Sequence, residues 1–171
     1  MKYYEEQDKK NIERIREILE QLPSFCKAFF YDMADYTSTR TRLAYAYDLK
    51  VFFDFLHKNN SVCGKMEITE IPISVLDRIT KDDILEYLDY MTLYDKEGRV
   101  IMNKERGKAR KIASLRSFYN YFYRAEKIEK NPASLIPVPR QHDKEIIRLE
   151  PQEVAILLDQ VERGEKLTTS Q

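Results

Sequence analysis

The fold is decided by the stretch STRTRLAYAYDLKVFFDFLHKNN, which occupies residues 38–60. Its apolar side chains recur every three or four positions, at Tyr45, Leu49, Phe52, Phe53 and Leu56. This spacing places them on one face of an α-helix, so the stretch predicts an amphipathic helix packed on a core. Ser38 and Thr39 are residue types that begin helices, and the polar run Lys58-Asn59-Asn60 ends this one.

The same periodicity predicts two helices before this segment. Residues 5–22 form an amphipathic pattern that Pro23 ends, because proline cannot continue a regular helix. Ser24 then caps a short predicted helix, whose apolar residues are Phe25, Phe29 and Phe30.

Two more helices are expected after it. Thr80-Lys81-Asp82-Asp83 resembles a capping box, with Asp in place of the usual Glu. The helix behind it should bury Ile84, Leu85, Tyr87, Leu88 and Met91. Residues 108–126 predict a second long helix. Its inward-facing residues are Ile112, Leu115, Tyr119 and Phe122.

The remaining segments are expected to be irregular. Residues 61–79 contain Pro72, residues 95–98 are a turn or loop tip, and no strand pattern is convincing. The sequence therefore predicts an all-α bundle of four to five helices over residues 1–130, then a Pro-containing linker over residues 131–148.

A terminal helix is expected to begin at Leu149-Glu150-Pro151, with Val154, Leu157, Leu158 and Val161 on one side. A single amphipathic helix cannot bury its own stripe, so residues 149–171 are interpreted as the start of a truncated second domain.

The charge is segregated although the chain is neutral overall. Residues 67–98 hold nine acidic and three basic residues, whereas residues 99–148 hold thirteen basic and five acidic ones. One face can therefore carry a positive potential that attracts nucleic acid, although solvated helices can also sort their charges unevenly.

Composition excludes several classes of protein. No signal peptide or membrane-spanning run is present, which predicts a cytoplasmic protein without a membrane partner. Cys26 and Cys63 have no metal-ligand spacing and are expected to be reduced thiols. No acid pair or glycine-rich phosphate loop occurs, so no cofactor, metal or small-molecule substrate is expected.

Three stretches in order resemble the core-binding domain of the tyrosine recombinase, or phage integrase, family, and its Xer-like members in particular. They are Ser38 to Leu49 with its Tyr45-x-x-Asp48-Leu49 core, Ile79 to Leu88, and Ala109 to Phe122 followed by Asn131-Pro132-Ala133 and Leu149 to Val154. The resemblance implies a SAM-like helical fold that grips a double-stranded DNA half-site. It also implies other recombinase protomers as partners on DNA.

In that family the catalytic arginines, lysine, histidines and tyrosine nucleophile lie in the domain after the linker. None of those motifs occurs in this sequence, so we expect no catalytic residue here and interpret the chain as a fragment of a longer recombinase. The twelve tyrosines have no grouped cationic partners and mostly lie on apolar stripes.

The candidate DNA-binding residues fall into three groups. A basic cluster at the start of the second long helix is joined by one hydroxyl, and it comprises Lys104, Arg106, Lys108, Arg110, Lys111, Ser114 and Arg116. The start of residues 38–60 contributes Thr39, Arg40, Thr41 and Arg42, and the linker contributes Arg140 and Lys144. Cationic side chains at a helix start bind phosphates and can reach base edges.

Each group also has a purely structural interpretation: a solvated helix end, N-terminal caps, or an ordinary linker. At the level of function, two alternatives stand beside DNA recombination. One is a helical protein-interaction module whose basic stretch binds an acidic partner, and the other is a stand-alone DNA-binding regulator.

Overall fold

A computed structural model describes residues 2–138 of the chain, and this part is mostly helical. The α-helices are α1 (Tyr3–Leu19), α2 (Cys26–Met33), α3 (Thr39–Asn59), α4 (Lys81–Thr92) and α5 (Glu105–Arg124). A hairpin joins α4 to α5 and consists of β1 (Leu93–Lys96) and β2 (Arg99–Met102). Short 3-10 helices span Cys63–Lys65, Ile68–Glu70, Ile73–Asp77 and Pro132–Leu135. The predicted helical class is confirmed.

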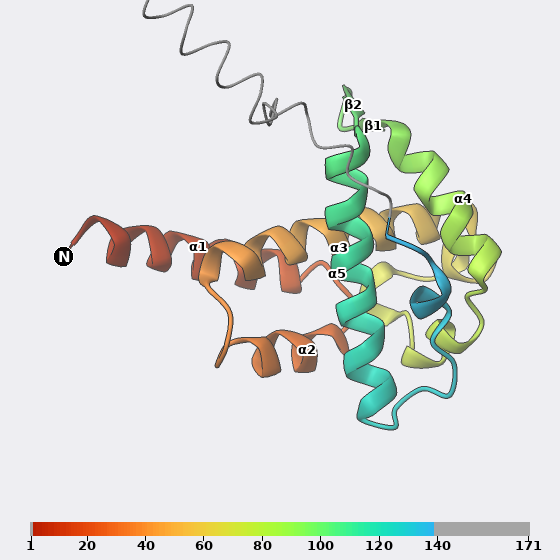
Figure 1. Ribbon diagram of the computed structural model, residues 1–171, viewed down its shortest axis with the longest axis horizontal. Coiled ribbons are helices and arrows are strands. Elements are labelled where there is room, and N and C mark those ends of the chain that lie inside the picture. The colour runs from red at the N-terminus through yellow and green to blue at the C-terminus, as the bar shows by residue number, and fades with distance from the viewer. Residues whose placement is uncertain (1, 139–171) are drawn as a thin grey trace, which may run out of the picture. The chain divides into compact units, whose positions relative to one another are not determined.

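The core lies where α3 meets the other helices. In Figure 1, α1 runs alongside α3, and α5 crosses α3. Phe118 of α5 is fully buried at this crossing, with its ring centroid 5.4 Å from that of Phe29 and 6.1 Å from that of Phe53. Each buried side chain of this size contributes about 1.5–3 kcal/mol. The predicted inward stripe of α5 is confirmed, and Phe118 belongs to it as well.

Two of the predicted helix starts are present as hydrogen-bonded caps. Thr41 N donates to Ser38 Oγ across 3.1 Å at the start of α3. At the start of α4, Asp83 N donates to Thr80 Oγ1 across 3.1 Å, while Thr80 N donates to Asp83 Oδ2 across 2.8 Å. These bonds satisfy amides that a helix start leaves without intrahelical partners.

The hairpin corrects the expectation that no strand is present. Tyr94 pairs with Ile101 and Lys96 with Arg99 across the two strands. The turn between them places Glu97 at φ 52° and Gly98 at φ 81°. Two-residue hairpin turns of this kind need positive φ at both central residues, and glycine adopts it without strain. Strands of four residues are too short to show a clear alternation in the sequence.

The predicted start of one helix and the predicted burial of one residue are also wrong. Helix α5 begins at Glu105 rather than near Lys108, so Lys108 lies one turn inside it. Leu85 is 44% exposed, because α4 turns it away from Tyr87 and Ile84. Residues 61–79 contain no α-helix, as expected, but form three 3-10 turns.

The chain after α5 returns to the bundle. Pro132, Ala133 and Ile136 are buried, and Arg116 Nη1 donates to the Ile136 carbonyl across 3.1 Å. This first part of the expected linker therefore packs as part of the bundle. The predicted helix over residues 149–163 lies outside the described residues. Within residues 2–138, no helix is long and apolar enough to cross a membrane.

Candidate nucleic-acid interface

Exposed basic side chains gather at the start of α5. Lys104 and Arg106 are exposed, and no side chain caps this helix. Lys108 is partly buried, and its Nζ donates to Thr92 Oγ1 across 3.1 Å. The positive end of the helix dipole lies at the same place, so the backbone adds to the attraction of these side chains for an anion.

Asp48 of α3 ties this cluster to the core. Its side chain is 1% exposed, and its Oδ1 accepts from Arg110 Nη2 at 2.7 Å and from Lys111 Nζ at 3.0 Å. The Arg110 side chain is 52% exposed, whereas that of Lys111 is 7% exposed. One buried carboxylate thus holds two cations, of which only Arg110 reaches solvent. Charge-assisted bonds of this kind fix the position of α5 against α3.

Three of the predicted contact residues lie inside the protein. Ser114 is 1% exposed, and its Oγ donates to the Lys111 carbonyl across 2.8 Å. Thr39 is 8% exposed and bonds to Asp8 and to Asn11 of α1. With Lys111, these residues serve the packing of α5 and α3, so we leave all three out of the interface. Ser114 lies one turn beyond Arg110, but it faces the core.

The other predicted residues divide by exposure. Arg40 and Thr41 are exposed at the start of α3. Arg42 is partly buried, and its Nε has no hydrogen-bond partner within the described residues. Arg116 is partly buried and holds the chain after α5 through its bond to the Ile136 carbonyl. Arg140 and Lys144 lie outside the described residues.

Sequence reasoning missed the part played by Asp48. Its partners stand 62 and 63 positions further along the chain, so no local pattern could reveal the pairing. The available signal was a lone acid on an otherwise apolar helix face, between Tyr45 and Leu49. A buried acid of this type needs cationic or hydrogen-bonding partners.

Three buried side chains that could act as nucleophiles are protonated and poorly reactive. Burial raises the pKa of Tyr87 well above its ordinary value and also raises the pKa of Tyr119, so both side chains stay protonated. Burial likewise raises the pKa of the Cys26 thiol, which is then a poor nucleophile. Within residues 2–138, no group of His, Cys, Asp or Glu could hold a metal ion.

Comparison with known proteins finds one matching family and several proteins similar to this chain. Residues 29–126 match the family described as phage integrase, N-terminal SAM-like domain. Tyrosine recombinase XerC of Caldanaerobacter subterraneus is 34% identical over 132 residues, which cover 73% of this chain and 36% of that protein. XerC of Chlorobaculum tepidum is 32% identical over 126 residues, which cover 72% of this chain and 33% of that protein.

The matched segment covers only part of each relative. XerC of Syntrophus aciditrophicus is 29% identical over 132 residues, covering 76% of this chain and 38% of that protein. The chain thus spans about a third of the length of the curated relatives that it matches. No solved structure matches it.

Proposed function

We propose, from the premise that this chain belongs to the phage integrase family through its N-terminal SAM-like domain, that it binds double-stranded DNA with the start of α5. One observation carries the proposal. Lys104 and Arg106 are exposed on a helix start that is rooted in the core through Arg110 and Asp48. A rigid cationic helix end of this kind can position itself on phosphates and reach base edges.

The proposed interface has a central part and a flank. The central part consists of Lys104, which precedes the first residue of α5, and of Arg106 and Arg110 on α5. The flank consists of Arg40 and Thr41 at the start of α3, where the hydroxyl and guanidinium can each bond a phosphate oxygen. Arg140 and Lys144 remain expectations for the segment that follows the described residues.

The wider role that we propose is recognition of a recombination half-site. The relatives are named tyrosine recombinases, and their name implies strand exchange through a tyrosine. In this proposal, the described helical domain supplies DNA binding and the contacts with other protomers on DNA. Cleavage and joining of strands belong to a different domain.

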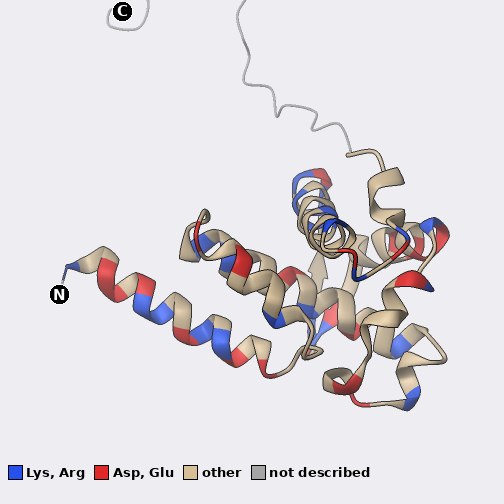
Figure 2. Ribbon diagram, turned by 90° about the horizontal axis from the view of Figure 1, so that it is seen from below, with Lys and Arg blue, Asp and Glu red and all other residues tan. Residues whose placement is uncertain are grey.

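The test compares duplex binding by two charge-reversed variants. Lys104→Glu with Arg106→Glu alters the proposed interface, while Lys9→Glu with Lys10→Glu alters α1 by the same charge. Helix α1 is a suitable control because acidic and basic residues alternate along it (Figure 2). Arg110 is left unchanged, because a glutamate there would meet the buried Asp48.

The slope of log affinity against log salt should become shallower by about 0.9 for each phosphate that the first pair no longer binds. The second pair should keep the slope of the unmodified chain. Equal losses of affinity in both pairs would mean that only the total charge matters. Indifference of the unmodified chain to duplex DNA would favour a protein-interaction module instead.

A further inference from the structure

The hairpin presents one face toward the helices. Tyr94 and Ile101 form a pair on this face, and Lys96 and Arg99 form the next pair along it. Tyr94 is buried and stacks on Tyr90 of α4, with 5.4 Å between the ring centroids. Side chains two positions apart on a strand share a face, so the anchored Tyr94 also orients Lys96 toward α3.

A cavity of about 560 Å³ lies beneath this face, between the hairpin and α1, α3 and α5. We call it the hairpin pocket. Five of its lining residues are basic, namely Arg14, Lys96, Arg99, Arg110 and Lys111. Glu97 is the one acid that lines it, and Tyr47 and Asn103 add polar groups. The volume is many times the roughly 30 Å³ that a water molecule occupies in the liquid, so a hydrated anion fits.

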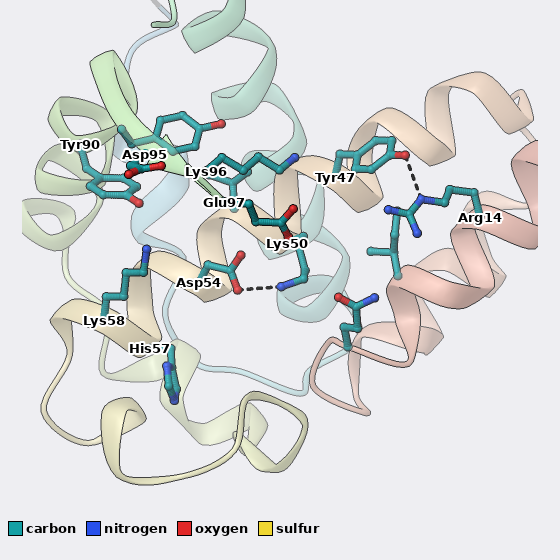
Figure 3. A pocket seen from close by; sticks show the side chains of 14 residues that line it. Arg14, Tyr47, Lys50, Asp54, His57, Lys58, Tyr90, Asp95, Lys96 and Glu97 are labelled. Carbon is teal, nitrogen blue, oxygen red and sulfur yellow. Dashed lines mark hydrogen bonds and ion pairs between the residues drawn. The ribbon is translucent and has the colours of Figure 1, made fainter. Parts of the chain in front are cut away.

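Tyr47 organises the cations at one side of the pocket. Arg14 Nε donates to the Tyr47 hydroxyl across 3.0 Å, and Lys96 Nζ lies 5.4 Å from the centre of the ring. Figure 3 shows both side chains converging on Tyr47, seen from an adjoining pocket that shares these three residues. Cation–π contact holds Lys96 near the cavity without neutralising its charge.

The charges of the pocket are only partly compensated. Arg110 and Lys111 share Asp48, and Arg14 pairs with Glu17 across 2.7 Å. Within residues 2–138, Lys96 and Arg99 form no ion pair with a carboxylate. Like charges that converge on one cavity repel each other, and an anion placed among them relieves that repulsion.

We propose that the hairpin pocket holds a backbone phosphate of bound DNA, contacted by Lys96 and Arg99. This inference rests on the proposed function and extends the interface from α5 to the hairpin. A phosphodiester suits the site because the guanidinium group of Arg99 and the ammonium group of Lys96 can donate to its oxygens. Arg110 lines the pocket and belongs to the α5 interface, so the two contact regions are continuous.

The test neutralises the hairpin cations and compares them with a matched pair. Lys96→Gln with Arg99→Gln removes two charges from the pocket. Lys127→Gln with Lys130→Gln removes two exposed charges just beyond the opposite end of α5. The hairpin pair should make the salt slope of duplex binding shallower by up to about 1.8, or about 0.9 for each cation that no longer meets a phosphate. The control pair should leave it unchanged.

A neutral methylphosphonate placed at each backbone position in turn locates the contact. At one backbone position, the methylphosphonate should lower the affinity of the unmodified chain but not that of the Lys96→Gln, Arg99→Gln variant. If the Lys104→Glu, Arg106→Glu variant loses DNA while the hairpin pair keeps both affinity and slope, the pocket inference is overturned and the proposed function stands. If the unmodified chain does not bind DNA, the proposed function is contradicted, and the pocket inference that rests on it is contradicted as well.

Inorganic phosphate separates the two sources of the ligand. Saturable amide shifts at Lys96 and Arg99 on its addition, together with unchanged DNA binding by the hairpin pair, would assign the pocket to a free anion and overturn the inference. Amide shifts at the same residues on adding duplex DNA, absent from the hairpin pair, support it.

Discussion

Arg110 and Asp48 stand 62 positions apart in the sequence, yet Arg110 Nη2 donates to Asp48 Oδ1 across 2.7 Å. The bond joins the helix that carries the proposed interface to the helix at the centre of the core. Because the carboxylate is buried and the guanidinium is half exposed, the same contact belongs to the interior at one end and to the surface at the other.

We expect Asp48→Ala to destabilise the fold by about 3–5 kcal/mol, because it leaves the buried Lys111 ammonium without its counterion. Urea unfolding followed by circular dichroism measures the change. Replacing Lys111 by Met in the same chain should recover most of the loss, since no unpaired buried charge then remains. Asp54→Ala breaks only the Lys50–Asp54 pair on one helix and should cost about 0.5 kcal/mol or less. Similar losses for Asp48 and Asp54 would contradict the buried anchor.

Arg110 and Lys111 share one acceptor but should respond differently to substitution. Arg110→Gln should make the salt slope of DNA binding shallower by about 0.9 and cost little stability, because Lys111 still balances Asp48. Lys111→Met should leave the slope unchanged, because the ammonium that it removes is buried, and should cost about 1.5–3 kcal/mol of stability, because Asp48 loses one of its two charged hydrogen-bond donors. Parallel binding and unfolding measurements on both variants check this separation, and the reverse pattern would refute it.

The cap of α4 offers a local test of the fold. Thr80→Ala should lower the free energy of unfolding by about 1 kcal/mol, because Asp83 N then loses its acceptor. Thr80→Ser retains a hydroxyl and should stay close to the unmodified chain. Chemical denaturation of the three proteins side by side measures the differences. An alanine variant as stable as the serine one would show that the cap contributes nothing.

Alkaline pH should weaken the fold through its buried tyrosines. Burial raises the folded-state pKa of Tyr119 above the value of about 10 in the unfolded chain. The contribution of protonated Tyr119 to the free energy of unfolding is therefore fully present below pH 10, and it is lost as the pH rises toward the folded-state pKa. There, one such group lowers the free energy of unfolding by about 1.4 kcal/mol per pH unit.

Tyr119→Phe isolates this contribution. The variant should be about 1 kcal/mol less stable at pH 8, because the Tyr119 hydroxyl donates to the Leu76 carbonyl across 3.1 Å. The deficit should shrink above pH 10, since phenylalanine has no proton to lose. Tyr87 is buried in the same way and remains in both proteins, so the difference reports Tyr119 alone. A constant deficit from pH 8 to pH 11 would contradict the assignment.

The sequence predicted the long helices well, because periodic stripes and caps are local signals. Ser38 and Thr80 cap the helices that they were expected to begin. The hairpin escaped prediction, because its four-residue strands depend on Tyr94 packing against α4 rather than on a pattern of their own. The dipeptide Glu97-Gly98 was the one local sign of a tight turn.

The candidate site was predicted only in part. The basic stretch was visible, but its division into exposed and buried members depends on which face of α5 packs on the core. The face of α5 that packs on the core includes Lys111 and Ser114, and both are buried. No local stretch of sequence predicts the carboxylate shared by Arg110 and Lys111 or the hairpin pocket, because each joins segments that are far apart in the chain.

The shared carboxylate also has an evolutionary consequence. Among the described residues, the side chains of Lys104 and Arg106 form no bond that holds another element in place. A protein that evolves toward a new target sequence can therefore substitute them one at a time. Positions 48, 110 and 111 are linked through a single buried oxygen, and a change at one alters what the other two can tolerate. Among homologues, we therefore expect these three positions to covary as a unit, while positions 104 and 106 diverge with the DNA that each protein recognises.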